Sequence, residues 1–199
     1  GNLTFATAPV VDSAGNLFFE ADPDTNGTAT FELTVQDNGG TANGGTDTSA
    51  MAGPFTITVT PVNDAPGLTA GANVTVAWAA GAQTVSGWAT GISAGPSDES
   101  TQTLTFNVTN NTNTALFSVQ PAVNGTSGDL TFTPATNASG AATITLTLSD
   151  NGGTANGGVD TSGAQSFTIT IDSSEDIEVL NGASTVGNGS TDMIGNNPV

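Results

Sequence analysis

The sequence lacks five residue types entirely: Lys, Arg, His, Cys and Tyr are absent from its 199 residues. Without Lys or Arg, no side chain can neutralise a phosphate group, which argues against nucleic-acid binding. Without Cys, disulfide bonds are excluded. Most nucleophiles and general bases are missing as well. A glycosidase needs only two carboxylates, but no pattern places two of them in a walled cleft. An enzyme is therefore the least favoured class.

The acidic side chains have no side chain of opposite charge to pair with. Eighteen Asp and Glu residues give a formal net charge of −18, so cations from solution must balance this charge, as in seawater or serum. An anionic membrane would repel the chain. The longest apolar stretches are only a few residues, which predicts no direct membrane insertion. High charge also has a simpler explanation, since it keeps proteins soluble.

An internal repeat of about 113 residues organises the chain. Residues 37–45 recur without change at 150–158, and the motif FTIT at 55–58 recurs at 167–170. Three parts follow from this alignment: the C-terminal half of a β-sandwich repeat at 1–60, a complete repeat at 61–172, and the start of a third, divergent β module at 173–199. Because the first part begins inside a repeat, we expect its missing half, and any targeting signal, to precede Gly1 in a longer polypeptide.

Alternating runs of Thr with Val, Ile, Leu or Phe indicate half-buried strands in the complete repeat. Clusters of Gly, Asn, Asp, Ser and Pro separate these runs and supply turns, and no helical pattern is visible. Seven strands are expected, near residues 74–78, 84–88, 104–108, 116–119, 130–132, 143–148 and 167–171. The predicted fold class is all-β, with tandem immunoglobulin-like or cadherin-like seven-strand β-sandwiches.

Several phrases resemble known repeats: PVNDAP at 61–66, GWAT at 87–90, LTFTP at 130–134 and TLSDNGG at 147–153. They are similar to the tandem cadherin-like and immunoglobulin-like β-sandwich repeats of large bacterial surface proteins, including adhesins. This resemblance covers roughly residues 1–172. It implies a location on the bacterial cell surface, with neighbouring repeats of the same polypeptide as partners. The segment EDIEVLNG at 175–182 is similar to the start of another β module of such proteins.

Strand order predicts that several acidic loops meet at one pole of the complete repeat. The entering linker, the loop after the second strand and the loop before the last strand all lie at that pole. The last bottom loop of the preceding half-repeat should face the same junction. It reads DPDTNG at 22–27, the opening of a calcium-loop pattern. Leu33 stands where an EF-hand needs a bidentate Glu, and the flanking segments are strands, so an EF-hand is rejected.

Calcium takes six to eight oxygen ligands in flexible geometry, and an oxygen-rich junction offers such ligands. In the family that the chain resembles, the Asn-Asp linker and nearby acidic loops hold Ca²⁺ and stiffen the joint between repeats. The alternative is that these side chains only form Asx turns. The candidate Ca²⁺ ligands are Asp22, Asp24, Asn26, Asn63, Asp64, Asp98, Glu99 and Asp150.

Three functions fit this organisation. The first is a structural repeat segment of a large extracellular adhesin or stalk, stiffened by Ca²⁺ at its junctions. The second is a subunit of a self-assembling extracellular fibre, because residues 1–60 supply only the last four strands of a sandwich and leave an edge that another copy could pair with. The third is a carbohydrate-binding module, which requires Trp78 or Trp88 to form an exposed platform. We expect both Trp residues to pack in a core instead.

Overall fold

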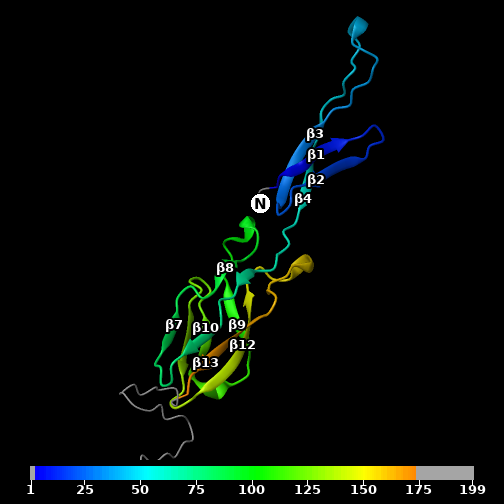
Figure 1. The fold of residues 1–199 in the computed structure, drawn as a ribbon. Coiled ribbons are helices and arrows are strands. Elements are labelled where there is room, and N and C mark those ends of the chain that lie inside the picture. The colour runs from blue at the N-terminus through cyan, green and yellow to red at the C-terminus, as the bar shows by residue number, and fades with distance from the viewer. Residues whose placement is uncertain (1–2, 174–199) are drawn as a thin grey trace, which may run out of the picture. The chain divides into compact units, whose positions relative to one another are not determined.

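The structure is a computed structural model that describes residues 3–173, so the prediction of a third module at 173–199 lies almost wholly outside the described residues. The described chain forms two compact units. The first contains residues 3–64 together with the short segments 95–102 and 152–159. The second contains the rest (Figure 1). The proposed repeat boundaries at residues 60 and 172 stay a prediction.

The second unit is a β-sandwich. One sheet has the strand order β6-β13-β12-β9 and the other the order β10-β11-β7, while β5 and β8 form a separate pair. All neighbours are antiparallel except β6 and β13, which run parallel. The strands are β5 (Gly67–Thr69), β6 (Val74–Val76), β7 (Gln83–Val85), β8 (Thr90–Ser93), β9 (Thr105–Asn111), β10 (Phe117–Val123), β11 (Leu130–Pro134), β12 (Gly140–Ser149) and β13 (Gln165–Ile171). A 3₁₀ turn, η3 (Thr114–Leu116), precedes β10.

The core of this unit follows directly from the alternating pattern. Along β12 the side chains of Ala142, Ile144, Leu146 and Leu148 are at most 1% exposed, because successive side chains of a strand point to opposite faces. Leu130 and Phe132 of β11 and Ile169 of β13 are equally buried. Each fully buried side chain of this size contributes about 1.5–3 kcal/mol through removal of apolar surface from water. The all-β sandwich prediction is confirmed.

Two of the seven expected strands, near 74–78 and 84–88, are shorter in the structure, where they form β6 and β7. Strands β5 and β8 were not expected from the sequence pattern, and Trp88 lies in the gap between β7 and β8. The indole N–H of Trp88 donates to the carbonyl of Ala72 at 2.9 Å, and its ring lies 4.2 Å from that of Phe167. Gly128 faces the same gap. A Cβ there would lie 2.2 Å from the carbonyl oxygen of Ala89, so only glycine fits.

The first unit contains two hairpins and three 3₁₀ turns. Strands β1 and β2 pair antiparallel, and β3 and β4 pair antiparallel. The bounds are β1 (Phe5–Val11), β2 (Leu17–Ala21), β3 (Gly27–Leu33), β4 (Ala52–Val59), η1 (Ala42–Gly44), η2 (Ser97–Glu99) and η4 (Ala155–Gly157).

These two hairpins repeat the geometry of β10–β11 and β12–β13. Val11 pairs with Leu17 as Val123 pairs with Leu130. The identical loops also share an unusual backbone, since Asn43 and Asn156 both have a positive φ, of 55° and 57°. The internal repeat is therefore present in the structure as well as in the sequence.

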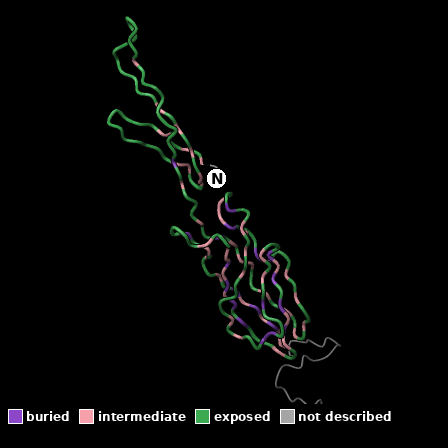
Figure 2. The backbone as a smooth tube through the Cα atoms, turned by 180° about the vertical axis from the view of Figure 1, so that it is seen from behind, coloured by how far each residue is buried: buried purple, intermediate pink, exposed green. Residues whose placement is uncertain are grey.

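Burial separates the two copies sharply (Figure 2). In the second unit Leu130, Phe132 and Phe167 are at most 4% exposed. Their counterparts in the first unit, Leu17, Phe19 and Phe55, are 41%, 41% and 45% exposed. In the second unit, the strands that cover these positions are β5–β9. The first unit has no such strands among residues 3–64, so its apolar face stays open.

Candidate cation site

Asn63 of the linker is held tightly within the first unit by the loop around η4. Its side-chain amide donates to the carbonyl of Val159 at 2.7 Å, and its own carbonyl accepts from the N–H of Val159 at 2.9 Å. Gly152 and Gly158 press against the same residue. A Cβ on Gly152 would lie 1.7 Å from Oδ1 of Asn63. The glycines of this loop therefore make room for the linker.

Asp64 is joined to the η2 turn. Its backbone N–H donates to Oε1 of Glu99 at 2.9 Å. Glu99 is only 7% exposed, and a buried carboxylate is stable only when hydrogen bonds compensate for lost hydration. A Cβ on Gly95 would lie 2.1 Å from the other oxygen of Glu99. Glu99 thus fixes the linker backbone, while Asp64 itself is exposed.

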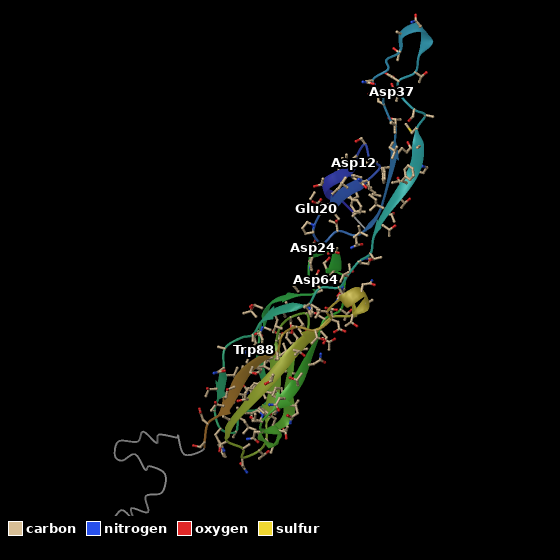
Figure 3. The ribbon with its side chains drawn as sticks, turned by 90° about the vertical axis from the view of Figure 1, so that its right-hand side faces the viewer. Asp12, Glu20, Asp24, Asp37, Asp64 and Trp88 are labelled. Atoms are coloured by element: carbon tan, nitrogen blue, oxygen red, sulfur yellow. The ribbon has the colours of Figure 1, made fainter. Side chains whose placement is uncertain are left out.

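A shallow cleft brings together acidic residues from three separate segments. It is lined by the turn after β2, the linker and η2, and Asp24, Asp64 and Asp98 all border it. Asp24 and Asp64 are labelled in Figure 3. The amide of Asn26 donates to Oδ2 of Asp98 at 3.0 Å. An adjoining cleft is lined by Asn26, Asn63, Asp98 and Glu99, among others.

The structure thus gathers six of the eight candidate residues around these two clefts and leaves two apart. Asp22 shapes the turn before Asp24, because its carbonyl accepts from the hydroxyl of Thr25 at 2.9 Å. Asp150 belongs to the second unit, where its N–H donates to the carbonyl of Asp160 at 3.0 Å. The residues that line the clefts are Asp24, Asn26, Asn63, Asp64, Asp98 and Glu99.

Gln102 is a site residue that the sequence pattern did not reveal. Its side-chain N–H donates to Oδ1 of Asn63 at 2.7 Å. Its buried Oε1 has no hydrogen-bond partner among the described residues. The only signal in the sequence is its position three residues after Glu99, which is too weak to separate it from other polar residues of the loop.

The donor set suits a hard cation, since carboxylate and amide oxygens are the ligands that Ca²⁺ prefers. The geometry supplies these groups only in part. Within residues 3–173, no three Asp or Glu side chains lie close enough together to hold a metal ion. One oxygen each of Asp98 and Glu99 already accepts a hydrogen bond within the site. A bound cation would therefore require the carboxylates around the cleft to move closer to one another.

Comparison with known proteins gives a limited result. No family model matches the sequence, and no curated protein matches it. Among solved structures, the chain is similar to the crystal structure of Drosophila N-cadherin EC1-4, with 13% sequence identity and a TM-score of 0.47. The match covers 85% of this chain and 42% of that one, so the chain spans less than half of its length. The sandwich described above rests on its own strand pairing and core.

Within residues 3–173, no helix has the length and apolar character needed to cross a bilayer.

Proposed function

We propose that this chain is a repeat segment of a large extracellular adhesin or stalk of a bacterial cell surface. The proposal is supported by the tandem duplication of the hairpins β1–β2 and β3–β4 as β10–β11 and β12–β13. Repeats with self-contained cores and short linkers suit a spacer that projects something from a surface.

Calcium is proposed to stiffen the linker between repeats. The observation that carries this proposal is the convergence of Asp24, Asp64 and Asp98 on one cleft in a chain without Lys or Arg. These like charges repel one another, and the chain has no side-chain cation to offset them. A divalent cation would offset the repulsion and bind the turn after β2, the linker and η2 to a single centre.

This proposal is tested with the full chain by thermal melts and isothermal titration in CaCl₂ and in EDTA. We expect Ca²⁺ to raise the melting temperature, and Asp64→Asn together with Asp98→Asn to abolish both the heat of binding and the rise. Mg²⁺ should bind more weakly, since it demands stricter octahedral geometry.

The matched control is Asp12→Asn, which removes one negative charge, as each of the two site substitutions does on its own. Asp12 lies in the turn between β1 and β2, and its counterpart Asn124 accepts similar turn hydrogen bonds. This variant should therefore keep the response to Ca²⁺. Equal loss of binding in the control and in the site variants would reject a specific site, as would the absence of any heat.

A further inference from the structure

We infer that the open apolar face of β1–β4 is a docking surface for a segment of the same type as residues 63–111. This segment consists of a linker Asn followed by the equivalents of β5–β9, of which those of β6, β7 and β9 would pair with the open edges. The inference rests on the repeat geometry and does not depend on Ca²⁺.

The second unit shows what covers an equivalent face. There, β11 pairs with β7 on the side not taken by β10, through Leu130 with Val85 and Phe132 with Gln83. Strand β13 pairs with β6, and β12 with β9. The corresponding edges of β2, β4 and β3 have no strand partner among the described residues. The first unit thus has three open strand edges, and each corresponds to an edge that β7, β6 or β9 covers in the second unit.

The side chains on this face also match the occupant. Leu17, Phe19 and Phe55 occupy the positions of Leu130, Phe132 and Phe167, which bury against Trp88 and its neighbours in the second unit. A pair of tilted rings, Phe31 and Phe55 at 5.6 Å, adds to the apolar surface. Burial of side chains of this size is stabilising, so an exposed apolar face favours association.

The loop at 37–45 supplies a second, independent match. Its twin at 150–158, with the following residue Val159, holds the side chain and the carbonyl of Asn63. Residue Thr46 stands where Val159 stands, and the two loops have the same sequence and the same positive φ at their central Asn. The first loop is therefore shaped to receive an Asn from a linker of the PVNDAP type.

The test joins a copy of residues 61–112 directly ahead of Gly1, since Gly1 aligns with Asn113. Hydrogen–deuterium exchange is then compared between this longer chain and the chain of 199 residues. We expect amide exchange in β2, β3 and β4 to slow by at least about tenfold, because open strand edges become paired. The control carries the same added segment with its copies of Val85 and Trp88 changed to Asp.

Two variants of neighbouring residues sharpen the test. Phe18 and Phe19 are both exposed in the chain as it stands, at 56% and 41%. Only Phe19 points into the face, since Phe18 matches the exposed Thr131. In the longer chain Phe19→Ser should lower the melting temperature clearly more than Phe18→Ser, whereas in the original chain the two should act alike.

Unchanged exchange in the longer chain, or equal protection by the Val85/Trp88 control segment, would overturn the inference. It would also fail if the original chain were dimeric by light scattering with β1–β4 already protected, because a second copy would then be the occupant. Loss of Ca²⁺ binding with intact protection would count only against the proposed cation site.

Discussion

Individual Asp side chains stabilise turns of this chain by accepting hydrogen bonds, since the chain has no Lys, Arg or His to pair with them. Asp129 accepts a hydrogen bond from the N–H of Gly87 at 2.7 Å. This bond, followed by one from Ser127, lowers the pKa of Asp129 below its ordinary value. In the same way the amide and N–H of Asn16 lower the pKa of Asp12. Asp12 lies in the turn between β1 and β2, and Asp129 lies in the corresponding turn between β10 and β11.

A pH dependence follows from the lowered pKa of Asp129. A folded-state pKa below the unfolded value means that the stabilisation is complete above the unfolded pKa, about 3.9, and is lost as pH falls through the folded pKa. The urea midpoint of the second unit should therefore fall less steeply below about pH 4 in Asp129→Asn than in the parent chain. Carboxyl-carbon NMR provides a direct check, and titration of Asp129 at or above the ordinary Asp value would contradict this prediction.

At the scale of elements, the segment between β7 and β8 contributes a side chain to the core. Trp88 lies in this segment and is 5% exposed, packed on Phe167 and bonded to the carbonyl of Ala72. Its burial confirms the expectation of a packing role and removes it from any exposed sugar platform.

Trp88→Ala should destabilise the second unit by about 3–5 kcal/mol, the range for a large aromatic side chain removed from a core. Val119→Ala provides the comparison. Val119 is 57% exposed, so its truncation should change the free energy of unfolding by less than about 0.5 kcal/mol. Chemical denaturation with tryptophan-independent detection measures both. A small effect of Trp88→Ala would contradict a central role of the indole ring in the core.

The sequence pattern predicted where the strands lie better than where they end. The long alternating run at 143–148 lies within β12, because a two-residue period with Thr and aliphatic residues allows only one buried face. Trp78 and Trp88 were expected inside strands, but both lie beyond strand ends. Their positions depend on tertiary contacts such as the approach of Gly128 to Ala89, which periodicity does not encode.

The candidate site was predictable in composition and only partly in arrangement. The motifs placed six of the eight residues at the two clefts, since a sandwich topology decides which loops share a pole. Asp150 lines neither cleft, because the contacts of its loop with Asn63 come from Gly152, Gly158 and Val159 instead. Gln102 was missed because a single Gln carries no periodic or motif signal.

For the whole molecule, the net charge of −18 without a single Lys or Arg is the dominant property. Self-repulsion opposes compactness, and salt at 0.1 M screens charges beyond about 10 Å. We therefore expect the melting temperature to rise with NaCl and with choline chloride alike, and then to level off. Melts at equal ionic strength test this, and a melting temperature independent of salt would contradict it. A further rise specific to CaCl₂ would separate site binding from screening.

The open face of β1–β4 also affects folding during synthesis. A ribosome completes residues 5–59 before strands β5–β9 emerge, and those strands emerge before β10–β13. For a time, β1–β4 are therefore the partners available to β5–β9 among the described residues. The 14 residues between Val59 and Val74 can extend to about 46 Å, long enough to bring β6 alongside β4 as β6 lies alongside β13. We therefore expect a circularly permuted sandwich to compete kinetically with the native one, and an already covered first face to remove this competitor.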